Sequence, residues 1–280
     1  MNQEQEDIDF HVVRTLGEIL NVSFLFIKEN FKQLAMLSLM IGAPFALLQA
    51  YINLQLAEMI TPETMGVMTS ETGILSLLIL LGSALTSSAV FTVVGNYISL
   101  YKVKMTGTGN VWAGVFLSMV LVFFTFFLYY IIIVVGLILL IIPGLYWMIG
   151  LSLSPVIALQ EKISPFKAFQ RSFALLNKQG GFSWEKFWSL FAMLLIVTIL
   201  LVVLGKIVEY GFGVFGFVSD FHAWTGTNTR VYYLIYTFLN TLLGVLIMII
   251  PVVVFHFQYF SYLEDKESSS IWKDIEKIGE

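Results

Sequence analysis

Long uninterrupted runs of apolar residues dominate this chain. A transmembrane helix needs about 20 residues to cross roughly 30 Å of hydrocarbon. The runs do not alternate with a period of two, as the strands of an outer-membrane β-barrel would. The pattern therefore predicts an all-α fold, a polytopic integral membrane helical bundle. Its charge-free runs are residues 33–57, 72–101, 105–160, 187–205 and 231–263.

One run, residues 105–160, is too long for a single helix even if that helix is tilted. Pro143-Gly144 lies inside it and is typical of a helix end followed by a turn. We therefore divide the run there. The fourth span reaches only about 24 Å at about 1.5 Å per residue, so we expect it to tilt little or to borrow residues from the turn. The six predicted spans are approximately 33–57, 72–101, 111–142, 145–160, 187–208 and 231–263.

The basic residues indicate an orientation, because cytoplasmic loops carry the excess of Lys and Arg. With both termini in the cytoplasm, only Lys206 and Arg230 of the 15 basic residues lie outside. A five-span arrangement would put neighbouring basic clusters on opposite faces. The acidic start of the chain lacks the features of a secretory signal. We expect a multi-pass protein of the bacterial cytoplasmic (inner) membrane, with residues 58–71 outside.

Amphipathic segments flank the predicted 33–263 bundle. Residues 1–32 form a cytoplasmic N-terminal segment with apolar residues at helical spacing, which predicts either a structural cuff around the bundle or a regulatory membrane-binding helix. Residues 264–280 form a cytoplasmic tail. The aromatic-rich segment 209–230 is expected to fold back onto the external interface.

A further interfacial helix is predicted over residues 164–178. Ser164 is a suitable N-cap and Pro165 suits the first turn. Lys167 and Arg171 are candidates for binding anionic lipid or a partner. Alternatively, these bases only satisfy the positive-inside rule. The opposite, apolar face is expected to bury Phe166, Phe169, Phe173 and Leu176 in the bundle or in the membrane interface.

No charged residue lies centrally in any predicted span, which argues against ion-coupled transport. Uncharged polar residues do enter two of the spans. Their spacing predicts polar faces for helix packing, with a solute-lining face as the alternative. We expect Asn96 to make an interhelical hydrogen bond and spans two and six to be neighbours. The candidate intramembrane packing residues are Ser88, Thr92, Asn96, Thr237 and Asn240.

Composition narrows the function classes. The chain is 58% hydrophobic and 12% charged with a mean hydropathy of +0.86, which excludes a water-soluble globule. A net charge of −4 offers no basic field for nucleic acid, and the lack of cysteine removes thiol chemistry.

The G-x-G-x-x-G match at 211–216 follows a membrane helix without a strand, so nucleotide binding is not expected. His11 and His256 are expected at the surface or interface; no catalytic residue, metal site or cofactor is predicted.

Residues 143–178 carry a resemblance to a known family, in the motifs Pro143-Gly144-Leu145-Tyr146, Ser154-Pro155, Pro165-Phe166-Lys167-Ala168 and Arg171-Ser172-Phe173. This order resembles the membrane domain associated with glycerophosphoryl diester phosphodiesterases and YciC-like bacterial membrane proteins of unknown role. Family members often have Trp after the Arg-Ser pair, where this chain has Phe173. The catalytic barrel of the phosphodiesterase is missing from this sequence. The resemblance therefore implies a bundle that anchors or assists another protein, not a hydrolase.

Together these features predict a non-enzymatic inner-membrane scaffold or accessory subunit of a membrane complex. Its expected partners are membrane lipids and other inner-membrane proteins, and nucleic acid is not among them. The alternative is a transporter or lipid-handling protein that uses the polar faces of spans two and six.

Overall fold

The computed structural model describes residues 8–59, 70–103, 111–178, 181–214 and 229–279. Within these residues, six helices or helix pairs are long and apolar enough to cross a membrane, which confirms the predicted all-α helical bundle. Predictions for residues 60–69 and 215–228, including His222, lie outside the described residues. The helices are α1 (Leu16–Met59), α2 (Ser70–Lys102), α3 (Val115–Leu139), α4 (Ile141–Gly150), α5 (Ser154–Glu161), α6 (Pro165–Leu175), α7 (Trp184–Val214), α8 (Thr229–Ile247) and α9 (Ile249–Gly279).

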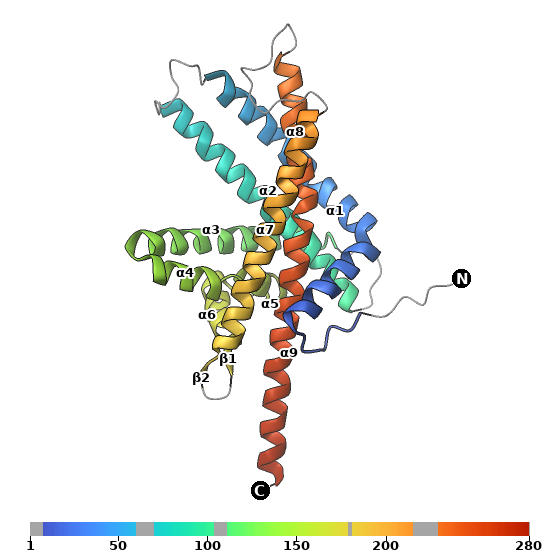
Figure 1. Ribbon diagram of the computed structural model, residues 1–280, viewed down its shortest axis with the longest axis vertical. Coiled ribbons are helices and arrows are strands. Elements are labelled where there is room, and N and C mark those ends of the chain that lie inside the picture. The colour runs from blue at the N-terminus through green and yellow to red at the C-terminus, as the bar shows by residue number, and fades with distance from the viewer. Residues whose placement is uncertain (1–7, 60–69, 104–110, 179–180, 215–228, 280) are drawn as a thin grey trace, which may run out of the picture.

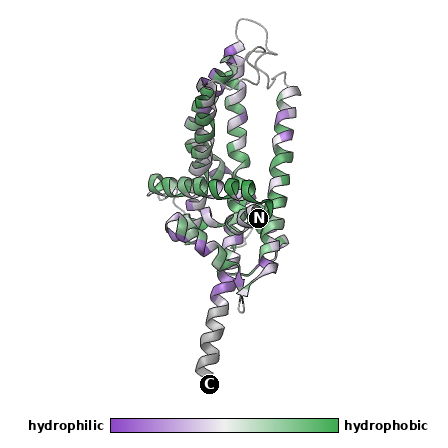
Figure 2. Cartoon of the chain, turned by 90° about the vertical axis from the view of Figure 1, so that its left-hand side faces the viewer, coloured by the Kyte–Doolittle hydropathy of each residue, from purple (hydrophilic) through white to green (hydrophobic). Residues whose placement is uncertain are grey.

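The helices run in two main directions. In Figure 1, α7, α8 and α9 follow the long axis of the molecule, and α9 continues beyond the other helices to the C-terminus. The pair α3 and α4 runs across that axis and projects sideways from the bundle (Figures 1 and 2). Figure 2 shows that α3 is hydrophobic along most of its length. The fold therefore combines a long bundle with an apolar side arm.

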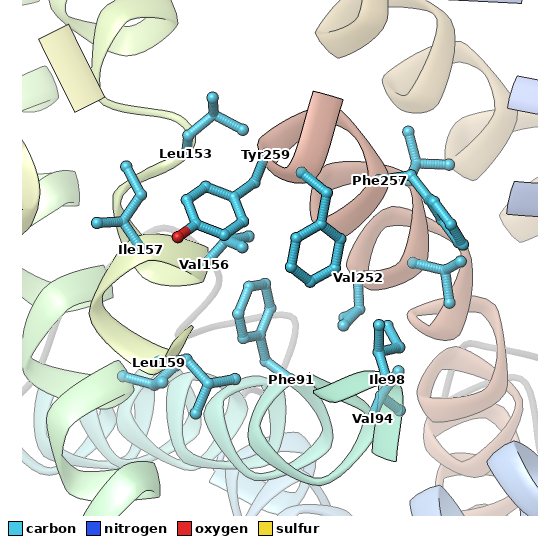
Figure 3. Packing of buried hydrophobic residues seen from close by; sticks show 14 of the residues in the cluster. Phe91, Val94, Ile98, Leu153, Val156, Ile157, Leu159, Val252, Phe257 and Tyr259 are labelled. Carbon is cyan, nitrogen blue, oxygen red and sulfur yellow. The ribbon is translucent and has the colours of Figure 1, made fainter. Parts of the chain in front are cut away.

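The core lies where α2, α5 and α9 meet. Figure 3 shows Phe91 and Val94 of α2, Val156 of α5 and Val252 and Phe257 of α9 gathered in one cluster. Apolar side chains face lipid as readily as protein in a membrane, so close packing favours this arrangement more than escape from water does. The core fixes the crossing of the helices near one end of the bundle.

The turn between α3 and α4 falls at Leu140, three residues before the predicted break at Pro143-Gly144. Leu140 is extended, with φ −158° and ψ 128°. Pro143 lies in the first turn of α4, where a missing backbone N–H costs no helical hydrogen bond. A Cβ on Gly144 would lie 2.6 Å from the backbone nitrogen of Leu137, so the two helices meet at a glycine. This close approach, not the proline, sets the position of the turn.

Several other boundaries differ from the predicted ones. Predicted span 145–160 is two helices, because α4 ends at Gly150 and Pro155 begins a new helix in its first turn. Helix α1 joins the predicted amphipathic segment and the first span into 44 continuous residues. Helix α9 passes without a break through the predicted boundary at residue 263. No proline lies at either predicted boundary, so the residues there continue the helix, and α1 also continues through Pro44 in its interior.

A short antiparallel hairpin joins α6 to α7. Its strands are β1 (Asn177–Lys178) and β2 (Gly181–Phe182), with Asn177 opposite Phe182. Gly181 has φ +129°, a conformation that favours glycine. Helix α6 begins as predicted, with Ser164 as its N-cap and Pro165 in its first turn, but it ends at Leu175, three residues before the predicted end at 178.

Candidate functional site

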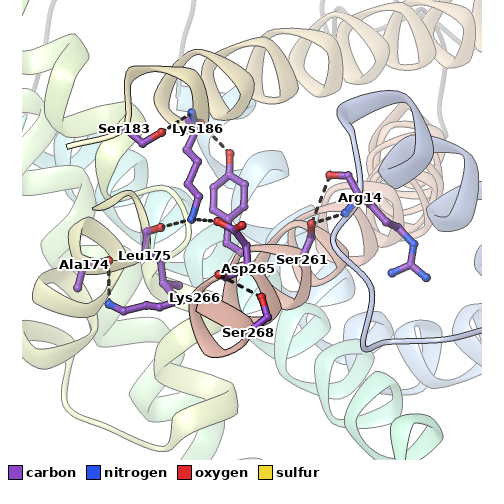
Figure 4. Close-up of polar contacts among 10 residues, drawn as sticks. Arg14, Ala174, Leu175, Ser183, Lys186, Ser261, Asp265, Lys266 and Ser268 are labelled. Carbon is purple, nitrogen blue, oxygen red and sulfur yellow. Dashed lines mark hydrogen bonds and ion pairs between the residues drawn. The ribbon is translucent and has the colours of Figure 1, made fainter. Parts of the chain in front are cut away.

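A buried ion pair joins the start of α7 to α9. Lys186 is only 6% exposed, and its Nζ lies 2.5 Å from Asp265 Oδ2. The same Nζ donates a hydrogen bond to the Leu175 carbonyl at the end of α6, 3.2 Å away (Figure 4). A buried ammonium needs such partners, because an unpaired charge is costly to bury. We call Glu161, Arg171, Lys186, Asp265 and Lys266 the polar junction.

Neutral hydrogen bonds hold the same helix end in place. The Tyr262 hydroxyl donates to the Lys186 carbonyl at 2.7 Å. The Lys186 backbone N–H donates to Ser183 Oγ at 3.4 Å, which makes Ser183 a cap for the first turn of α7. The start of α7 is therefore tied to α9 through both its side chain and its backbone.

The second ion pair of the polar junction joins α5 and α6. Arg171 Nε lies 3.0 Å from Glu161 Oε1, and the Tyr259 hydroxyl donates to the same oxygen at 3.1 Å. Lys266, beyond the apolar run of α9, donates to the Ala174 carbonyl at 2.9 Å. Burial, together with the positive charges of Arg171 and Lys186, lowers the pKa of Lys266. Arg171 and Glu161 therefore pair with each other, and Lys266 holds the end of α6 to α9.

The N-terminal segment closes one side of the polar junction. The Arg14 backbone N–H donates to Ser261 Oγ at 2.9 Å (Figure 4). Between this segment and the helices α7 and α9 lies a cavity of about 320 Å³, lined in part by Arg14, Lys186 and Asp265. Among the residues that the structure describes, no group of three or more His, Asp or Glu side chains is placed to hold a metal ion.

The structure places Lys167 and Arg171 in different roles. Lys167 is exposed, whereas Arg171 is half-buried and paired with Glu161. Phe166 of the predicted apolar stripe does not pack against the bundle, because it is 65% exposed. Its burial in the membrane interface, the other environment expected for the stripe, stays a prediction. The buried face of α6 consists of Ala168, Phe169, Ser172 and Leu175. The stripe is rotated because Ser172 is drawn inward, where its hydroxyl donates to the Gly150 carbonyl at 2.6 Å.

Two of the three predicted packing residues of α2 make only local bonds. Ser88 and Thr92 are buried, and their hydroxyls donate to the carbonyls of Ala84 and Ser88, each one turn earlier and 2.7 Å away. Asn96 Nδ2 donates to the Val111 carbonyl at 3.3 Å. This bond reaches the turn before α3, not a neighbouring helix as predicted. The hydroxyls of Ser88 and Thr92 are therefore satisfied within α2, whereas Asn96 links α2 to another segment. Two further residues of α2 also bond other helices: the Tyr97 hydroxyl donates to Asn30 Oδ1 of α1, and the Ser99 hydroxyl donates to Gln160 Oε1 of α5, each at 2.7 Å.

The polar residues of α8 do not join those of α2. The Thr237 hydroxyl donates within α8, to the Tyr233 carbonyl at 2.6 Å. Asn240 is exposed and lines a cleft with α7, whose described lining comes from α7 and α8. Span two does contact span six, through α9. The predicted neighbours are therefore correct, but the two polar faces do not form one shared surface.

His256 is the residue that the sequence analysis placed wrongly. It is 0% exposed in α9, its ring lies beside Phe91, and its Nδ1 is 2.6 Å from the Val252 carbonyl. Gly95 of α2 makes room for it, because a Cβ there would lie 2.7 Å from His256 Nε2. Its place inside the charge-free run 231–263 was the available signal of burial.

Comparison of the chain with protein-family models, with curated proteins and with solved structures gives no match.

Proposed function

We propose that this chain is a non-enzymatic scaffold or accessory subunit of a complex in the bacterial cytoplasmic membrane. The observation that carries the proposal is the side arm formed by α3 and α4. Its tip has consecutive apolar residues that are each more than half exposed: Ile138, Leu139, Leu140, Ile141 and Ile142. An arm of this kind offers a neighbouring membrane protein a large apolar surface outside the bundle.

A photo-crosslinking residue at Ile142 tests this proposal in native membranes. Leu80 of α2 is the matched control, because it is also an exposed apolar residue of a candidate span. We expect Ile142 to yield one discrete protein adduct that co-purifies in stoichiometric amount, and Leu80 to yield lipid adducts only. The same adducts from both positions, or lipid adducts alone from Ile142, would contradict a docking role for the arm.

The proposed orientation has both termini in the cytoplasm, and the thirteen-to-two division of basic residues supports it. Reporter fusions at residues 65 and 280 should report opposite compartments.

Gly144 is buried, so the tip of the arm is better tested with a cysteine at Ile142, which is 81% exposed. If all six spans cross the membrane completely, the tip of the arm lies outside, and an impermeant thiol reagent should label this cysteine from outside the cell. Labelling from neither side would place the tip within the hydrocarbon.

The exposed face of α6 is proposed as a second contact, with headgroups or a cytosolic partner. Phe166 and Lys167 lie side by side there, and an aromatic ring next to a base suits the membrane interface. Lys167→Gln should weaken retention of anionic lipid or partner, whereas Lys28→Gln, at an exposed lysine of α1, should not. If both variants retain the lipid or partner equally well, Lys167 serves only to set the orientation of the chain in the membrane.

A lipid-handling protein is the second candidate function. It is favoured by the cleft between α7 and α8, where Asn240 lies. The shared polar face of spans two and six, on which the alternative of a solute pathway depended, is not assembled, because Asn240 lines the cleft with α7. The resemblance of residues 143–178 to a domain associated with an enzyme of lipid headgroups agrees with either candidate.

A further inference from the structure

A cleft of about 480 Å³ opens between the C-terminal parts of α7 and α8. Val202, Gly205, Lys206 and Glu209 line it from α7, and Tyr236, Asn240 and Gly244 are among the residues that line it from α8. This volume lies within the range of about 300–1,000 Å³ that is usual for ligand pockets. The cleft lies far along α7 from the polar junction, which holds only the start of that helix.

Two glycines line the cleft without any close contact. A Cβ added to Gly205 or to Gly244 would meet no atom within 4 Å. At Gly42 of α1, by contrast, a Cβ would lie 2.9 Å from Val245 of α8. Small residues on membrane helices usually let the helices approach closely. In this cleft they leave room that the described residues do not fill.

The cleft has one apolar end and one charged end. Val202 and Ile247 line the apolar end, while Lys206 and Glu209 pair at the other with 2.6 Å between Nζ and Oε2. Both charged side chains are more than half exposed, at 61% and 51%. Lys206 is the first charged residue after the apolar run 187–205, so the pair lies at the depth where hydrocarbon gives way to headgroups.

We propose that this cleft binds one phospholipid with a zwitterionic, primary-amine headgroup of the ethanolamine class. The acyl chain lies in the space left by Gly205 and Gly244. The lipid phosphate pairs with Lys206, and the lipid ammonium pairs with Glu209. An exposed ion pair contributes little to stability, so its partners exchange for headgroup charges at little cost. This assignment goes beyond the scaffold role and needs no protein partner.

Charge complementarity selects this class of lipid over an anionic one. A phosphatidylglycerol headgroup carries the phosphate that suits Lys206 but no ammonium for Glu209. The Glu209 carboxylate then faces an uncompensated negative charge a few ångströms away, which is unfavourable at the membrane surface. The amide of Asn240 lines the same cleft and suits the ester groups of either lipid.

Native mass spectrometry of the full chain in mild detergent tests the proposal, with phosphatidylethanolamine and phosphatidylglycerol titrated separately. We expect one phosphatidylethanolamine to be retained more tightly than phosphatidylglycerol. Gly205→Leu and Gly244→Leu fill the cleft and should each lower that retention about tenfold. Gly82→Leu is the matched control, because a Cβ on Gly82 of α2 also meets nothing within 4 Å.

Substitutions of Lys206 and Glu209, the two residues proposed to bind the headgroup, decide the same question if a leucine variant fails to fold. Both residues are exposed and should tolerate substitution. Glu209→Gln should remove the preference for the ethanolamine lipid, and Lys206→Gln should weaken retention of both lipids. The proposal is overturned if the folded Gly244→Leu protein retains the lipid as the unmodified chain does. It is also overturned if Glu209→Gln keeps the preference, or if a second copy of the chain occupies the cleft in place of lipid.

Discussion

Helix α7 carries a lysine–carboxylate pair near each end, and the two pairs differ in almost every respect. Lys186 is buried and reaches Asp265, 79 positions away along the chain, where Leu175 and Tyr262 complete its surroundings. Lys206 is exposed and reaches only Glu209, three positions away. The first pair therefore fixes α7 to α9, whereas the second lies beside the open cleft between α7 and α8 and joins neither helix to the other. The two helices meet beyond it, where the ring of Phe212 contacts that of Tyr236.

The difference shows that a charge pair constrains the fold only where it joins separate elements away from solvent. A local, exposed pair is screened by water and by salt, so it does not hold neighbouring helices together. A buried pair between elements ties together the groups around it, since removing either partner leaves a charge without compensation. We therefore expect α7 to be rigidly held at its Lys186 end and adaptable at its Lys206 end.

The largest expected effect is at the buried pair. Lys186→Ala should lower the free energy of unfolding by about 2–3 kcal/mol, less than for a fully buried pair because Asp265 is partly exposed. Lys206→Ala should leave the unfolding midpoint unchanged. Thermal unfolding in one detergent provides the measurement. A double variant, Lys186→Met with Asp265→Leu, should recover part of the loss, and equal effects of the two alanine variants would remove the contrast between the helix ends.

The side arm should show the next largest effect. Gly144→Ala forces a Cβ against the Leu137 backbone and should cost about 1–3 kcal/mol. Gly205→Ala, in open space within α7, should instead be neutral or stabilise by up to about 1 kcal/mol, because alanine favours helix. The same melting experiment compares them. A stable Gly144→Ala protein would mean that the two helices of the arm are not in close contact.

Asn96 should give the smallest of these effects. Asn96→Leu removes one hydrogen bond to the Val111 carbonyl and should cost about 0.5–2 kcal/mol. Asn240→Leu, at an exposed cleft position, is the control and should not lower the melting temperature. Unchanged stability of Asn96→Leu together with a transport or growth phenotype would favour a solute-lining role for α2.

The fold class follows from the sequence because run length and charge spacing are local properties of the chain. The six candidate spans could be predicted in this way, including the division of the run 105–160. The position of the turn at Leu140 could not, since it depends on the contact between two helices at Gly144. Close and open glycines look alike in the sequence, and only the neighbouring helix tells them apart.

The candidate sites were predicted less completely than the fold. Arg171 could be recognised as a base on α6, but not its pairing with Glu161, since that contact depends on the angle between α5 and α6. The polar junction was missed because Lys186 and Asp265 were assigned to separate cytoplasmic flanks. The burial of His256 depends on the space beside Gly95 of another helix. Long-range contacts of this kind leave no periodic signal in one sequence.

The central claim is that α7 is packed at its Lys186 end and open at its Lys206 end. Gly150→Leu and Gly244→Leu test it most directly, through their melting temperatures in the same detergent without added phospholipid. A side chain at Gly150 would overlap the ring of Phe173, which stacks with Tyr146, and Tyr146 in turn stacks with Phe187 of α7. We expect Gly150→Leu to cost about 1–3 kcal/mol and to lower the melting temperature clearly, whereas Gly244→Leu leaves it unchanged. Equal losses in both variants, or a larger loss at Gly244, would contradict the account.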